Sequence, residues 1–170
     1  MDGLVLPQIF RQERRLYNVG YELIIGLRDM FCELYIKKVK DRTIDLIENN
    51  TFVRENLLTI RENAVHADQV KLCFAIMELE AWWLGIPSLW EDIDPITKEQ
   101  YELDFASPES VFHPAVVIKK LCQAKGKDYD KHKGEVESIV GKIEREHFVD
   151  LHESQRCPSF CEFVNYIQTS

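Results

Sequence analysis

Hydrophobic and polar positions divide the chain into a β-like first half and a helical second half. An apolar run that ends in an acid predicts a strand over Glu22–Leu27, and a nearly continuous apolar run predicts a buried strand over Val70–Ile76. Between them, helical spacing predicts one helix around residues 44–47 and another, capped by Asn50 or Thr51, through Ile60. Strand, helical crossover and strand together predict a parallel pair with a right-handed connection.

The second half of the chain is expected to be helical. Asp94-Pro95, within Trp90–Leu103, and His113-Pro114 each place a capping residue before a proline at the first helical position. Further helices are expected from about Gly134 to Ile143 and from about Pro158 to Ile167. The predicted fold class is therefore α/β: a small, mainly parallel sheet with helical crossovers, followed by a helical C-terminal half.

Length and composition narrow the class of protein. The 170 residues fit one domain, with an N-terminal segment (1–20), a sheet core (21–90) and a helical half (91–170). No apolar run reaches the ~20 residues of a membrane span, and the N-terminus has no secretory signal. Five cysteines without a scaffold-like spacing predict reduced thiols, and so a cytoplasmic protein.

The formal net charge of −8 argues against binding nucleic acid through bulk electrostatics. It does not exclude nucleic acid, because carboxylates that hold Mg²⁺ recruit phosphate through the metal. The seven glycines are scattered and form no phosphate loop, and the chain has no Gly-x-Ser-x-Gly elbow, so a serine hydrolase is disfavoured.

Acidic residues follow both predicted strands. Asp29 lies just past the first strand, Glu33 one short loop later, and Glu78 and Glu80 follow the second strand. Parallel strands present their carboxyl ends at one edge of a sheet, where ligands gather. Three or four acids that converge there would form an oxygen-rich site for Mg²⁺ or Mn²⁺.

Each of these acids also has a structural interpretation. Asp29 and Glu33 would then be a turn aspartate and a solvated glutamate. Glu78 and Glu80 would lie on the polar side of a helix whose apolar side carries Trp82 and Trp83. Spacing within the chain leaves both interpretations open.

Two other clusters in the chain contain side chains that could bind a metal or a phosphate. His147, His152, Cys157 and Cys161 are separated by five, five and four residues, which fits no familiar zinc motif, so packing and surface roles are favoured. The cluster Tyr129–Lys133 is either a solvated loop or a source of a lysine that neutralises a phosphate.

The segment Glu78-x-Glu80-Ala81-Trp82 resembles an uncharacterised bacterial family of Toprim-like proteins marked by a Glu-Ala-Trp signature. That family is related to the nucleases of overcoming-lysogenization-defect type. The resemblance covers roughly Tyr21 to Ile167. It is also carried, in order, by Leu27-Arg28-Asp29, His113-Pro114, Tyr129-Asp130-Lys131 and Cys157-Pro158-Ser159-Phe160 with Phe163.

The resemblance implies a Toprim-like sheet whose acids bind Mg²⁺ for phosphodiester chemistry, in phage defence or genome maintenance. Asp29 would match the metal-binding aspartate, Glu78 and Glu80 the signature acids, and Lys131 the lysine two residues after the tyrosine. Metal held in this way activates water and stabilises the leaving oxygen of an in-line displacement.

Two departures from the family pattern set up an alternative. No strand-and-glutamate segment precedes the Asp29 strand, for which Glu13 is a poor substitute, and Asp29 is followed by Met30-Phe31-Cys32-Glu33 instead of a second aspartate. The chain could then be a catalytically incomplete interaction or regulatory subunit of a defence or toxin–antitoxin system. A missing first strand would also leave an open sheet edge. We expect Val5–Phe10 as a substitute strand, a second copy in a homo-oligomer, or a partner protein to cover that edge.

Overall fold

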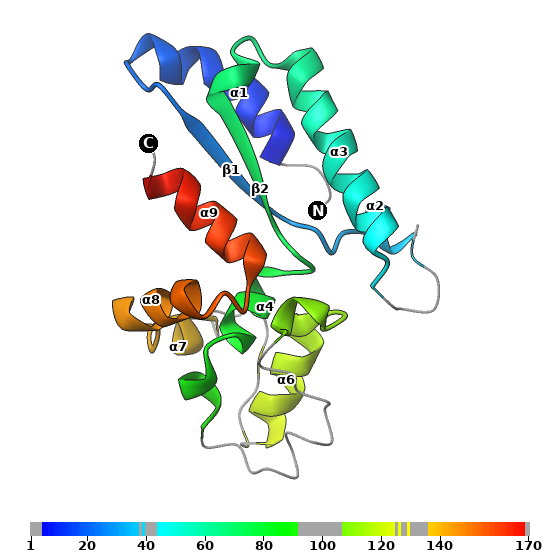
Figure 1. The fold of residues 1–170 in the computed structure, drawn as a ribbon, viewed down its shortest axis with the longest axis vertical. Helices are drawn as coiled ribbons and strands as arrows, with labels where there is room; N and C mark the ends of the chain where they lie inside the picture. Colours follow the sequence, from blue (N-terminus) through cyan, green and yellow to red (C-terminus); the bar gives the residue numbers. More distant parts are fainter. Residues whose placement is uncertain are drawn as a thin grey trace. The chain divides into compact units, whose positions relative to one another are not determined.

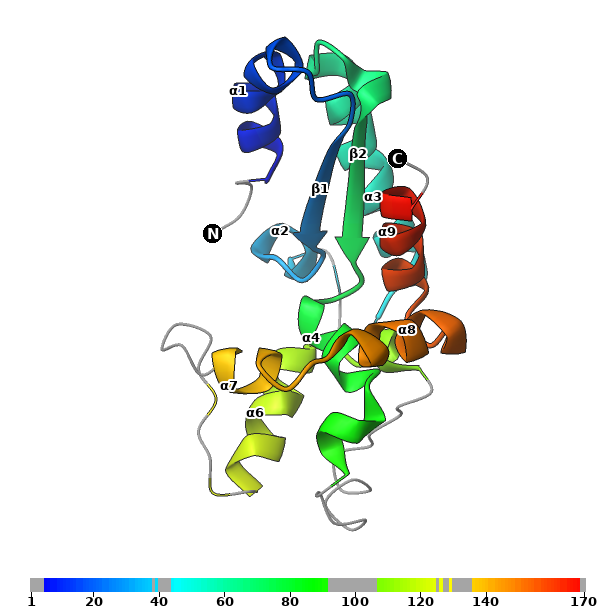
Figure 2. The same ribbon diagram turned by 90° about the vertical axis from the view of Figure 1, so that its left-hand side faces the viewer.

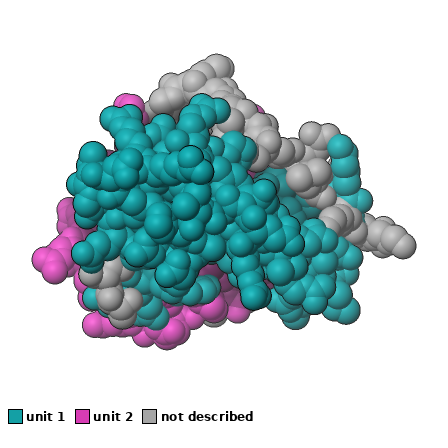
Figure 3. All heavy atoms as spheres, turned by 90° about the horizontal axis from the view of Figure 1, so that it is seen from above, with its two compact units in different colours: residues 1–75, 162–170 teal, residues 76–161 magenta. Residues whose placement is uncertain are grey.

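The computed structural model describes residues 5–37, 39, 44–91, 107–124, 126, 129 and 136–168. The chain divides into two compact units, which are coloured separately in Figure 3: unit 1 comprises residues 1–75 and 162–170, and unit 2 comprises residues 76–161. No helix among the described residues is long and apolar enough to cross a membrane. The first part of unit 1 contains α1 (Val5–Asn18), β1 (Ile24–Asp29), α2 (Glu33–Ile36), α3 (Leu46–Asn63), η1 (Ala67–Gln69) and β2 (Val70–Ala75).

A parallel pair of strands forms the sheet of unit 1 (Figure 1). The register runs from Ile24 opposite Val70 to Asp29 opposite Ala75, and the backbone N–H of Met30 extends the pairing by donating to the Ala75 carbonyl at 3.0 Å. The predicted parallel pair is confirmed, and with the helices that follow it the fold class is α/β. β1 begins two residues later than predicted, and Glu22, before it, is exposed.

Helix α1 packs against β1 at a glycine. A Cβ atom at Gly26 would lie 2.8 Å from the Cδ1 of Ile9, so the bare backbone at this position permits the close approach of the helix. The prediction of a substitute strand over Val5–Phe10 is wrong, since this segment begins α1. Val5 and Ile9 are four residues apart, which places both on the helix face toward the sheet.

Helix α3 is one helix where two were predicted. Asp45 caps it by accepting hydrogen bonds from the backbone N–H groups of Ile47 and Glu48, at 2.9 and 3.2 Å. The helix continues through the predicted cap at Asn50 and Thr51. Polar residues inside the helix suggest a break in the sequence pattern. However, Asn49 and Asn56 are buried, and they accept hydrogen bonds from Tyr35 and Arg28, respectively.

Both faces of the strand pair are covered within unit 1 (Figure 2). On one face, the ring of Phe52 in α3 meets that of Phe74 edge-on at 6.0 Å, and the Arg28 guanidinium lies 5.1 Å from the Phe52 centroid. On the other face, Cys73 lies near Glu162 and Tyr166 from the end of α9 (Pro158–Gln168). Alternation along β2 explains why neighbouring residues face different helices.

Unit 2 is built from short helices around an apolar core. Its elements are α4 (Leu79–Leu84), η2 (Pro87–Trp90), η3 (Pro108–Ser110), α6 (Pro114–Ala124), α7 (Val136–Val140), α8 (Arg145–Ser154) and the first residues of α9. One buried cluster in this core comprises Leu84, Trp90, Ile118, Leu121, Tyr129 and Ile139.

The helix starts at Pro114 and Pro158 are confirmed. The helix predicted from Gly134 to Ile143 ends at Val140, and α8 was not predicted, because Phe148 and Val149 in it are exposed and blur its apolar pattern. The helix predicted around Asp94-Pro95 lies outside the described residues.

Candidate functional site

The predicted acids lie where the two strands end. Asp29 is the last residue of β1 and Glu33 is the first residue of α2, both in unit 1. In unit 2, Glu78 follows the end of β2 by three residues, and Glu80 is in the first turn of α4. Lys131 lies outside the described residues.

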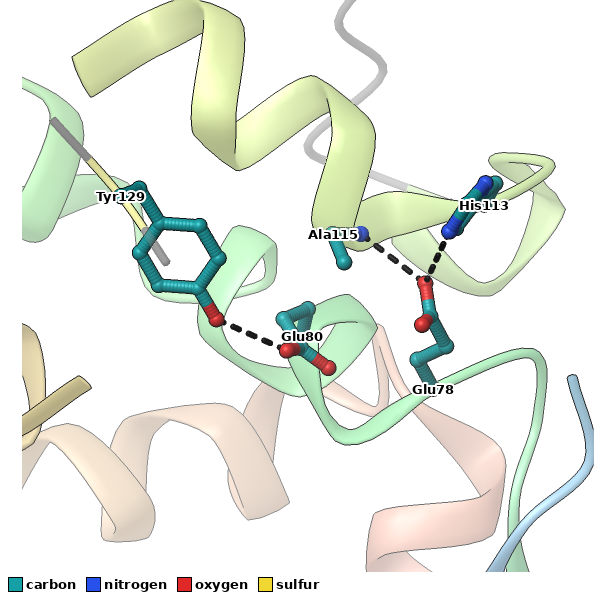
Figure 4. A network of polar contacts seen from close by, with 5 residues as sticks. All are labelled: Glu78, Glu80, His113, Ala115 and Tyr129. Atoms are coloured by element: carbon teal, nitrogen blue, oxygen red, sulfur yellow. Dashed lines mark hydrogen bonds and ion pairs between the residues drawn. The ribbon is translucent and has the colours of Figure 1, made fainter. Parts of the chain in front are cut away.

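Glu78 joins the segment after β2 to the start of α6 (Figure 4). Its Oε2 accepts a hydrogen bond from the backbone N–H of Ala115 at 3.0 Å and lies 3.8 Å from the Nε2 of His113. The side chain is buried, with 5% of the residue exposed. A carboxylate at a helix N-terminus is favourable because it satisfies a free N–H group and faces the positive end of the helix dipole.

Glu80 binds a tyrosine of the unit 2 core. Its Oε1 accepts a hydrogen bond from the Tyr129 hydroxyl at 2.8 Å, and only 2% of Glu80 is exposed (Figure 4). Burial, together with the charge of Glu80 and the hydrogen bond to it, raises the pKa of the Tyr129 phenol. Glu80 lies in α4 together with Trp82 and Trp83, and Glu78 precedes the helix, but both carboxylates are buried and bonded.

Two residues next to this network have left-handed backbone conformations. Met77, immediately before Glu78, has a φ of +64°, and His113 has a φ of +60°. Met77 is also completely buried. Non-glycine residues with positive φ are uncommon, and they gather at sites where the surrounding structure holds them in place. The strained positions mark the neighbourhood of Glu78 as a candidate site.

A second buried polar network was not predicted from the sequence. A carboxylate oxygen of Glu109 accepts a hydrogen bond from the backbone N–H of Ser159, at 3.1 Å, and the Trp82 Nε1 donates to the Ser159 hydroxyl at 2.9 Å. Burial raises the pKa of Glu109, and its hydrogen bonds partly oppose that rise. The only available signal was the position of Ser159 inside Cys157-Pro158-Ser159-Phe160; nothing near Glu109 pointed to it.

In the cluster of two histidines and two cysteines, Cys157 and Cys161 are buried, whereas His147 is at the start of α8. Burial raises the pKa of the Cys157 and Cys161 thiols, which disfavours the thiolate form that binds metals. The Nδ1 of His147 accepts a hydrogen bond from the Glu144 backbone at the start of α8. Among the described residues, no group of three or more His, Cys, Asp or Glu side chains is arranged to hold a metal ion.

Comparison with known proteins found no relative of this chain. No protein-family model, curated protein or solved structure matches the chain.

Proposed function

We propose that this chain is a Toprim-like, Mg²⁺-dependent nuclease-type domain that acts on phosphodiesters in bacterial defence or genome maintenance. The observation that carries the proposal is the position of the acids: Asp29 ends β1, and Glu78 and Glu80 follow its parallel neighbour β2. Ligands of open α/β sheets gather at the carboxyl ends of parallel strands, where these acids occur.

The proposal gives each residue a chemical role. Asp29, Glu33, Glu78 and Glu80 would be ligands of Mg²⁺ or Mn²⁺, since both ions prefer carboxylate oxygens. Lys131 would neutralise a phosphate oxygen. With a net charge of −8, the chain would recruit the phosphates of nucleic acid through bound metal instead of through bulk attraction.

A second candidate function is a catalytically incomplete interaction or regulatory subunit. The observation that favours it is the bonding of the two signature acids. Glu78 accepts a hydrogen bond from the Ala115 backbone, and Glu80 accepts one from the Tyr129 hydroxyl. These contacts give both carboxylates a role in holding unit 2 together, whether or not they also bind metal.

Metal-dependent thermal stability tests the metal site. A ligand that binds only the folded state stabilises it by RT ln(1 + [L]/Kd), about 2.7 kcal/mol at a hundredfold excess over Kd. We expect the melting temperature of the parent to rise with MgCl₂ or MnCl₂ and the Asp29→Asn variant to lose that rise. Asp68→Asn, which changes an exposed aspartate of unit 1 in the same way, should keep it.

Three results separate the candidates. Without a metal-dependent shift in the parent, the metal site is refuted. A shift without cleavage of labelled DNA or RNA indicates a bound but incomplete site, which is the second candidate. Cleavage that needs Mg²⁺ and is lost in Asp29→Asn supports the nuclease. Asp29 is chosen for this test because it ends β1 in unit 1, where Asp68 offers a matched control.

A further inference from the structure

The negative charge of the chain is distributed unequally between its two units. Unit 1 contains 11 lysines and arginines against 12 aspartates and glutamates, whereas unit 2 contains 10 against 17. Unit 2 therefore carries most of the net charge, and unit 1 is close to neutral. Repulsion of a polyanion is weakest at unit 1.

Helix α1 of unit 1 has an exposed face that carries three arginines. Arg11, Arg14 and Arg15 are all exposed. With 3.6 residues per turn, they lie within about 100° of one another around the helix axis. The two buried residues of the helix, Ile9 and Glu13, lie on the opposite side.

No negative charge interrupts this face. The one acid of α1 is Glu13, which is buried and bonded to the backbone N–H groups of Val65 and His66. The exposed neighbours on the face, Gln8 and Asn18, are neutral. Within the described part of the chain, none of the three arginines forms an ion pair. Among the residues that the structure describes, no carboxylate therefore competes for these exposed guanidinium groups.

We infer that this arginine face of α1, made of Arg11, Arg14 and Arg15, binds the phosphate backbone of a nucleic acid. The guanidinium fork fits phosphate oxygens in pairs, and four residues of helix span about 6 Å. Contacts of this kind position a nucleic acid without reading its sequence. The choice of nucleic acid over another polyanion rests on the proposed function.

Binding to a labelled duplex tests the inference without involving the metal site. Fluorescence anisotropy of a fluorescein-labelled DNA duplex of about 20 base pairs is measured in EDTA between about 50 and 200 mM NaCl. We expect the affinity of the parent to fall steeply with salt. Replacing the three arginines by glutamine should weaken binding at low salt about tenfold or more and reduce the salt slope by about 3, nearly one unit for each lost phosphate contact.

The matched control is a second triple variant. Arg54, Arg61 and Arg145 are exposed arginines outside α1, and their replacement by glutamine changes the net charge by the same amount. Circular dichroism and melting temperature of both variants check that they fold. We expect the control variant to keep most of the affinity, because a local face, and not total charge, makes the contacts.

Several results would overturn the inference: no duplex binding by the parent at the lowest salt, an unchanged affinity in the α1 variant, or an equal loss in the control. Binding of labelled polyglutamate, but not of DNA, by the arginine face would reassign it to an acidic protein. Because EDTA removes divalent metal, failure here leaves the Mg²⁺-dependent rise in melting temperature as a separate test of the proposed function.

Discussion

The carboxylate of Glu13, in α1, accepts hydrogen bonds from the backbone N–H of Val65 at 3.1 and 3.0 Å, although the two residues are 52 positions apart. Only 2% of Glu13 is exposed. The next N–H, that of His66, also points at this carboxylate, and the His66 ring meets Tyr17 of α1 edge-on at 4.6 Å. Through these hydrogen bonds, Glu13 links α1 to the segment that follows α3.

Removing the hydrogen bonds of Glu13 should destabilise the protein. Glu13→Ala removes the acceptor of these part-buried, charge-assisted hydrogen bonds, which we expect to lower the free energy of unfolding by about 2 kcal/mol. Glu13→Gln keeps one acceptor oxygen and should cost less. Urea denaturation measures both. The control is Glu62→Ala on the exposed side of α3, where we expect about 0.5 kcal/mol or less. An equal loss in the two alanine variants would show that Glu13 has no special role.

Tyr129→Phe tests the hydrogen bond to Glu80. The substitution removes one donor from a buried carboxylate without changing the shape of the ring, and we expect a loss of about 1–3 kcal/mol in the free energy of unfolding. Tyr21→Phe, at an exposed tyrosine, is the matched control and should be close to neutral. If Tyr129→Phe unfolds at the same urea concentration as the parent, the bond contributes nothing to stability.

The pH dependence of stability should reveal the burial of Glu109. Because burial raises its pKa above the ordinary value of 4.5, the folded protein holds this proton more tightly than the unfolded chain does. The stability from this group is therefore complete below pH 4.5 and is lost as the pH rises through the raised pKa. We expect the free energy of unfolding of the parent, relative to Glu109→Gln, to fall as the pH is raised from 4.5 toward neutrality. A relative stability that rises with pH would contradict this sign.

The five cysteines should react in two classes. Cys73, Cys157 and Cys161 are buried, and burial raises the pKa of the Cys73 thiol to about 11, whereas Cys32 and Cys122 are partly exposed. Since the thiolate is the reactive form, we expect two fast and three slow thiols with a chromogenic disulfide reagent at pH 8, and five in urea. Serine at Cys32 and Cys122 should remove the fast phase. A third fast thiol in the native protein would contradict the burial of the other three.

The sequence predicted the parallel strand pair correctly, but it did not predict the type and extent of the helices that pack against it. The parallel pair was predictable because both strands are apolar runs with clear ends. Helix α1 was not, because its inward face includes an acid, Glu13, whose partner is the backbone of Val65. The sequence did not show that α3 is one continuous helix. Asn49 and Asn56 look like a break in the helix until their distant partners are known.

The same limit applies to the candidate site. The positions of Glu78 and Glu80 after β2 follow from the sequence alone. Their partners do not, because Ala115 and Tyr129 lie 37 and 49 residues away, and only tertiary packing brings them to the carboxylates. The roles of Asp29 and Glu33 as metal ligands stay predictions, which titration with Mg²⁺ addresses directly.

Helix α9 gives the chain a particular order of assembly. Its first residues belong to unit 2, but residues 162–168 belong to unit 1, where Glu162 and Tyr166 lie near Cys73 of β2. During synthesis, the N-terminal 75 residues of unit 1 leave the ribosome long before this last piece. Unit 2 can complete its core first, whereas one face of β2 is covered only after the end of α9 has been synthesised. The synthesis of unit 1 thus begins first, and its folding is completed last.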